Sequence, residues 1–82
     1  MDFERLKRNI FAALTPPELR LLKGRIAQNN GLVTRRGEEG ERLLDNHRLS
    51  AYGRIDDRLE TGVISAEQAE REKAKWDVMH GY

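Results

Sequence analysis

The chain has 82 residues, of which 38% are hydrophobic and 35% are charged, and its formal net charge is +1. This length suits one small domain, while the absence of cysteine excludes disulfides and Cys-based zinc sites. No apolar run approaches the roughly 18 residues that a membrane span needs, and no signal-peptide pattern opens the sequence. We therefore expect a cytoplasmic protein that does not enter a membrane.

The two halves of the chain differ in charge. Residues 1–36 hold eight basic and three acidic side chains, whereas residues 37–82 hold seven basic and eleven acidic ones. The halves should attract each other, within one chain or head to tail between copies.

Residues 2–14 are predicted to form the first helix, with Asp2 as its N-cap. Its apolar face recurs at helical spacing and comprises Phe3, Leu6, Ile10, Ala13 and Leu14. Arg5 and Arg8 point away from that face, so the helix is expected to be apolar inside and basic outside.

A second helix is predicted over residues 16–30. Thr15 and Glu18 have the spacing of a capping box, and Pro16 and Pro17 occupy positions where a missing N–H costs least. Gly31 is the expected C-terminal stop. Residues 32–40 would then form a connector in which Leu32 and Val33 are extended.

Residues 40–60 are predicted to form the central helix on which the rest packs. Its apolar stripe comprises Leu44, Ala51, Tyr52, Ile55 and Leu59. Arg48 lies within this stripe and Leu49 lies opposite, so either the helix breaks near residues 46–47 or Leu49 contacts something outside the core. We favour one unbroken helix. Gly53 in its interior predicts the close approach of another backbone.

The last helix is predicted over residues 66–79, capped by Ser65, with Ile64 stapled to Ala69 and with Trp76 as its main docking residue. The sequence thus predicts an all-α fold: a single helical domain over residues 1–82, built as a small bundle of four helices at about 2–14, 16–30, 40–60 and 66–79.

The turn before the last helix resembles a known family pattern. The matching residues include Leu59, Gly62, Ile64, Ser65, Glu67 and Lys73. Their order is similar to the leucine, glycine, isoleucine, Ser/Thr, acidic and lysine pattern of the short C-terminal domain motif. This resemblance spans about 20 of the 82 residues and implies two small helices around a turn, together with a role in association.

No pattern of catalytic residues is apparent. His47 and His80 each stand alone in the sequence, without metal-ligand spacing, and Asp56 and Asp57 would point about 100° apart on a helix. The glycines follow neither phosphate-loop pattern. We therefore predict a protein that is not an enzyme and has no catalytic residues, metal ligands or cofactor.

Protein binding is the favoured function. Two leucines lie off their core faces and three large residues gather near the C-terminus, and aromatic residues and Met are enriched at interfaces. The candidate partner-binding residues are Leu21, Leu49, Trp76, Met79 and Tyr82. We expect a regulator of the adaptor or inhibitor kind that binds a protein partner and forms homodimers; many small charged helical proteins encoded by phages or bacteria are of this type.

Nucleic-acid binding is the alternative. The basic N-terminal half could present one positive face to phosphates. Its candidate residues are Arg5, Arg8, Arg20, Lys23, Arg25, Arg35 and Arg36. A recognition helix starting near Thr34 would carry three acidic residues and two glycines in its first turns, which disfavours groove readout.

Overall fold

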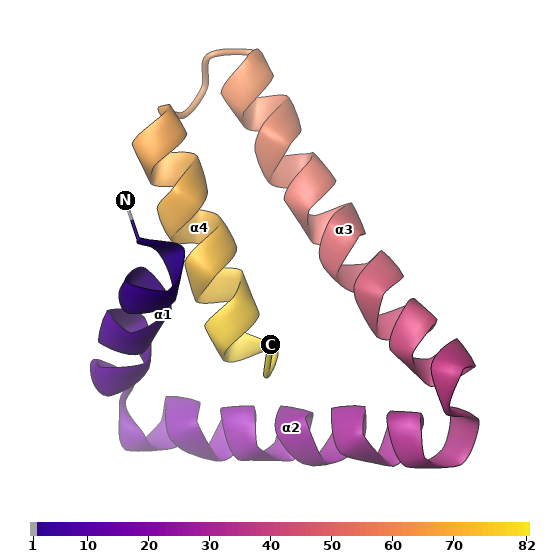
Figure 1. The fold of residues 1–82 in the computed structure, drawn as a ribbon. Coiled ribbons are helices and arrows are strands. Elements are labelled where there is room, and N and C mark those ends of the chain that lie inside the picture. Colours follow the sequence, from indigo (N-terminus) through magenta and orange to yellow (C-terminus); the bar gives the residue numbers. More distant parts are fainter. Residues whose placement is uncertain (1) are drawn as a thin grey trace.

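The computed structural model describes residues 2–82 and contains four helices in that range (Figure 1). Their bounds are Phe3–Ala12 for α1, Pro16–Arg36 for α2, Glu38–Glu60 for α3 and Ala66–Met79 for α4. α2, α3 and α4 outline a triangle, and α1 lies beside α4 (Figure 1). The predicted all-α class is confirmed. Within the described residues, no helix is both long and apolar enough to cross a membrane.

Local capping fixes the start of three helices as the sequence predicts. The Asp2 carboxylate accepts hydrogen bonds from the first turn of α1. Thr15 and Glu18 form the complete capping box of α2, with Thr15 N donating to Glu18 Oε1 at 3.0 Å. Ser65 Oγ accepts from Gln68 N at 3.1 Å at the start of α4.

The predicted end of the second helix at Gly31 is wrong. α2 continues to Arg36, and Gly37, with a φ of 54°, is the one residue between α2 and α3. Leu32 and Val33, which were expected to be extended, are helical and half-buried. A glycine inside a helix costs only about 1 kcal/mol, and burial of these two side chains exceeds that cost.

The close backbone approach lies at Gly40 and not, as predicted, at Gly53. A Cβ atom on Gly40 would come within 2.6 Å of the Leu32 carbonyl oxygen, whereas one on Gly53 would meet nothing within 4 Å. Gly40 therefore permits the tight corner between α2 and α3.

The predicted stripe of α3 faces the interior, since Ala51 and Ile55 are buried and Leu44, Tyr52 and Leu59 are half-buried. Ile55 packs with Ile64 and Ala69 in the core.

The helix at the centre is nevertheless α4 and not α3, because α4 contacts all three other helices while α1 packs on α4 alone. Small side chains explain this: Ala69 and Ala74 are at most 2% exposed and let neighbouring helices approach closely. Trp76, the predicted docking residue, is only half-buried.

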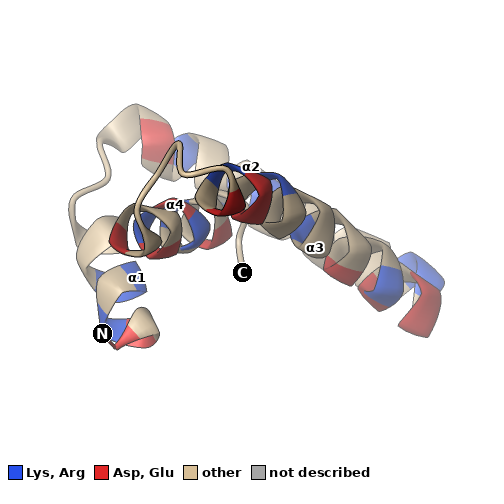
Figure 2. Cartoon of the chain, turned by 90° about the horizontal axis from the view of Figure 1, so that it is seen from above, with Lys and Arg blue, Asp and Glu red and all other residues tan. Residues whose placement is uncertain are grey.

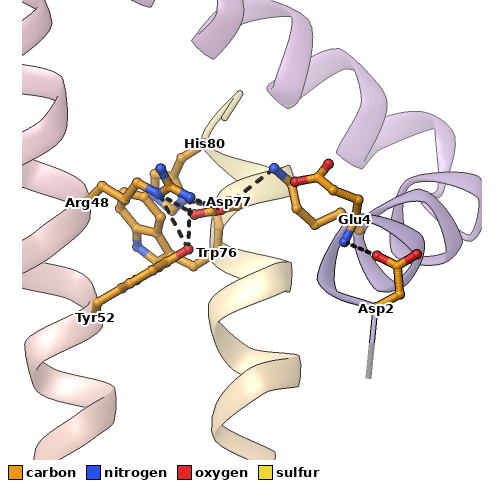
Figure 3. Close-up of polar contacts among 8 residues, drawn as sticks. Asp2, Glu4, Arg48, Tyr52, Trp76, Asp77 and His80 are labelled. Carbon is orange, nitrogen blue, oxygen red and sulfur yellow. Dashed lines mark hydrogen bonds and ion pairs between the residues drawn. The ribbon is translucent and has the colours of Figure 1, made fainter.

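A buried ionic network joins three helices (Figure 3). Asp77 of α4 is fully buried, and its two carboxylate oxygens accept from Arg48 Nε at 3.1 Å and from Arg48 Nη2 at 2.7 Å. Lys7 Nζ of α1 lies 3.7 Å from Asp77 Oδ2. The network explains why an arginine interrupts the apolar stripe of α3. The prediction of one unbroken helix is confirmed, since α3 runs from Glu38 to Glu60 without a break.

Tyr52 completes this network. Its hydroxyl accepts from Arg48 Nε and Nη2, each at 3.3 Å, and its ring lies 5.2 Å from the guanidinium carbon. Burial is the main cause that raises the pKa of Tyr52 to about 12, and the nearby Asp77 carboxylate acts in the same direction.

Hydrogen bonds connect the end of α4 to both α2 and α3. Arg25 Nη1 and Asn29 Nδ2 of α2 donate to the carbonyl oxygens of Met79 and His80, at 2.6 and 2.8 Å. The Tyr82 hydroxyl donates to the Leu44 carbonyl of α3 at 2.7 Å. The bonds from Arg25 and Asn29 satisfy carbonyls at the end of α4 that would otherwise lack intrahelical partners.

We predict opposite effects for two glycine substitutions. Gly53→Ala should raise the free energy of unfolding by about 1 kcal/mol, because alanine is the better helix former and has open space there. Gly40→Ala should lower it by about 1 to 3 kcal/mol, because the added methyl group meets backbone. Urea denaturation measures both; equal stabilisation by the two substitutions would contradict the α2–α3 corner described here.

The free energy of unfolding should also decrease at alkaline pH, because Tyr52 loses its proton more readily in the unfolded chain than in the folded one. The folded-state pKa of about 12 lies above the unfolded value near 10, so this contribution is intact below pH 10 and is lost as pH rises towards 12. Between pH 9 and 11 the loss should be about 1 kcal/mol. Urea denaturation of Tyr52→Phe should show a correspondingly shallower decline than the wild type; parallel pH curves would contradict the assignment.

Candidate protein-binding groove

An open groove of about 530 Å³ lies between α3 and α4. Ala51 and Ile55 of α3 and Trp76 and Met79 of α4 supply its apolar lining. It opens beside the seam where α3 and α4 pack.

The rim of the groove is mainly basic. It carries Arg54 and Arg58 from α3, and Lys75 and Glu72 from α4. Arg58 Nη1 pairs with Glu72 Oε1 at 2.7 Å, and the second oxygen of that carboxylate, Oε2, is buried without a hydrogen-bond partner. No carboxylate within residues 2–82 forms an ion pair with Arg54 or Lys75.

Trp76 is held by a stack of rings at the end of α4. The His80 ring lies 4.0 Å from the Trp76 ring at an angle of 12°, and the rings of Tyr82 and His47 lie 5.4 and 5.2 Å away. The Trp76 carbonyl accepts from His80 Nδ1 at 2.8 Å, which fixes the tautomer of that imidazole. The indole is therefore preorganised in the groove wall.

The ionic network also orients this wall. Trp76 and Asp77 are consecutive, so their side chains point about 100° apart around the α4 axis. Because Arg48 and Lys7 fix the direction of Asp77, they also fix the rotation of α4 that turns Trp76 towards the groove.

The structure brings together only some of the predicted partner-binding residues. Trp76 and Met79 share the groove, and Tyr82 contacts Trp76. Leu49 is 64% exposed and lines a separate depression beside Asp45, while Leu21 is 52% exposed on α2.

Sequence reasoning missed Arg54 and Lys75 as groove residues. The available signal was the spacing of Arg54 and Arg58, which places two arginines four residues apart beside the apolar stripe of α3.

Two of the predicted nucleic-acid-binding residues make contacts within the chain. Arg25 donates to the Met79 carbonyl, and Arg36 lies 3.7 Å from the Glu39 carboxylate. Arg20 and Arg35 are separated by about 22 Å along α2, at about 1.5 Å per residue. Basic and acidic positions occur on all four helices (Figure 2).

The two histidines are closer than the sequence indicated. Predicted to be isolated, His47 and His80 have ring centroids 5.9 Å apart, because their side chains meet between α3 and the end of α4. Within residues 2–82, no group of three or more His, Asp or Glu side chains is placed to hold a metal ion. Asp56 forms an ion pair with Lys73 at 2.6 Å.

Comparisons of the chain with protein-family models, curated proteins and solved structures find no match. The resemblance of residues 59–73 to the short C-terminal domain motif therefore carries no family assignment. Two helices do flank the turn, with α3 ending at Glu60 and α4 beginning at Ala66, but α3 has 23 residues and is longer than the small helix that the resemblance implies.

Proposed function

We propose that this protein is a non-enzymatic regulatory module, of the adaptor or inhibitor kind, that binds a short acidic amphipathic helix of a protein partner in the α3–α4 groove. The observation that carries this proposal is the combination of an apolar lining with a basic rim in one open groove.

The dimensions of the groove suit a helix. Its α3 wall runs from Ala51 to Arg58, which is about 10 Å, or two helical turns. A partner helix with apolar residues at i, i+3, i+4 and i+7 could place two of them against Trp76 and Met79. Both residue types are enriched at interfaces, and Trp is common among the residues that dominate binding energy.

The basic residues at the rim of the groove favour an acidic partner helix. Arg54 and Lys75 lie at the groove and form no ion pair within residues 2–82, although the Glu18 carboxylate of α2 attracts Lys75 at longer range. Arg58 is paired with Glu72. Carboxylates flanking the apolar stripe of a partner helix would complement them, whereas a basic helix would be repelled. The engagement of Arg25 and Arg36 in contacts within the chain favours this function over nucleic-acid binding.

The test uses Trp76, the single tryptophan of the chain, as a fluorescent probe. Two synthetic helical peptides would share one apolar stripe and carry either glutamates or lysines on their flanks. We expect the glutamate peptide to bind at least about ten-fold more tightly than the lysine peptide, with an affinity that falls as salt rises.

Charge reversal provides the decisive comparison. The double variant Arg54→Glu/Lys75→Glu should lose the preference for the glutamate peptide. Leu21→Asp, an exposed change on α2, is the control and should retain it. An unchanged preference in the double variant would overturn the proposal. So would a failure of both peptides to bind, or a salt-dependent affinity for duplex DNA that Arg35→Glu/Arg36→Glu abolishes.

A further inference from the structure

A second cavity, of about 240 Å³, lies where α2, α3 and the end of α4 converge. Its lining residues are Arg25, Gln28, Asn29, His47, His80 and Tyr82. We infer that this cavity, the α2–α4 pocket, binds a small anion that carries a carboxylate or phosphate group. The inference does not depend on the proposed function of the groove.

The charges around the pocket favour an anion. Arg25 is cationic, the His80 imidazole can gain a proton, and no carboxylate side chain lines the pocket. The buried carboxylate near His80, that of Asp77, is already bonded to Arg48 and paired with Lys7.

The end of a helix normally repels anions, because its last carbonyl groups carry partial negative charge. Here the carbonyl oxygens of Met79 and His80 already accept hydrogen bonds from Arg25 and Asn29. These bonds offset the repulsion that an anion beside the end of α4 would otherwise meet.

The pocket also supplies donors. One guanidinium N–H of Arg25 is used by the Met79 carbonyl, and an arginine carries five, which suits paired hydrogen bonds to a carboxylate or phosphate. The Gln28 amide is a further donor. Tyr82 adds only its ring and an acceptor oxygen, because its hydroxyl hydrogen is directed to Leu44.

The volume of the pocket limits the size of the ligand. Pockets for drug-sized molecules are typically 300 to 1,000 Å³. The 240 Å³ here suits inorganic phosphate, a small phosphate ester or a short carboxylic acid.

Binding should be linked to protonation of His80. Burial is the main cause that lowers the pKa of His80 below its usual value, and the charges of Arg25 on α2 and His47 on α3 act in the same direction. The Trp76 carbonyl and Asp77 on α4 oppose them. An anion in the pocket would favour the imidazolium and raise this pKa, so affinity should increase as pH falls through the range in which His80 gains its proton.

The experiment follows the imidazole resonances of the two histidines by NMR. The wild type is titrated with inorganic phosphate and, separately, with acetate and succinate, while chloride holds the ionic strength constant. We expect saturable shifts of both histidines at millimolar ligand, with tighter binding at pH 5.5 than at pH 7.5. Saturation with phosphate alone, with carboxylates alone, or with both supports the inference and identifies the ligand class.

Matched charge changes on α2 make the test specific. Gln28→Glu places a carboxylate in the pocket at an exposed position and should weaken binding at least about ten-fold. Asn30→Asp makes the same change of charge at an exposed position outside the pocket lining and should leave binding unchanged. Absence of saturable shifts in the wild type, or equal weakening by the two substitutions, would overturn the inference.

Discussion

The buried carboxylate of Asp77 is the constraint on which the rest of the structure depends. A carboxylate without solvent exposure is costly unless it is paired and hydrogen-bonded. Arg48 meets this requirement with two hydrogen bonds across the α3–α4 seam, and Lys7 adds a cation from α1. Removing Arg48 would leave the buried carboxylate without these hydrogen bonds, so helix positions that keep the Arg48–Asp77 pair intact are strongly favoured.

Hydrogen bonds and ion pairs between helices matter more for the placement of the helices in this chain than in a larger domain, because the apolar core is small. Within residues 2–82, seven hydrophobic side chains are buried, and three of them are alanines. A chain of this length buries only about 60 to 65% of its unfolded surface. The small core alone does not fix the relative positions of the helices. The network at Asp77 and the hydrogen bonds at the end of α4 therefore help to fix them.

Both candidate sites result from this placement. The α3–α4 seam carries the ionic network on one flank and the groove on the other, with Trp76 next to Asp77 in the chain. The α2–α4 pocket forms where Arg25 and Asn29 hold the end of α4 against α2. His80 lines both the groove and the pocket, so occupancy of one site is placed to influence the other.

Features governed by local chemistry could be predicted from the sequence. The caps at Asp2, Thr15 and Ser65, and the stripe of α3, depend on residues a few positions apart. Gly31 was mistaken for a stop because the burial that carries α2 past it involves α3. Arg48 was recognised as anomalous within the stripe, but its partner lies 29 residues away and no local pattern identifies it. The groove and the convergence of the histidines were unpredictable for the same reason: they require the relative positions of helices.

A double-mutant cycle on Arg48 and Asp77 tests the central role of this pair most directly. The free energy of unfolding would be measured by urea denaturation for the wild type, Arg48→Met, Asp77→Asn and the double variant. Charge-assisted hydrogen bonds in a buried setting predict a coupling energy of about 1.5 to 3 kcal/mol, with the double variant less destabilised than the sum of the single changes. Additive effects, with a coupling below about 0.5 kcal/mol, would contradict the role assigned to the pair.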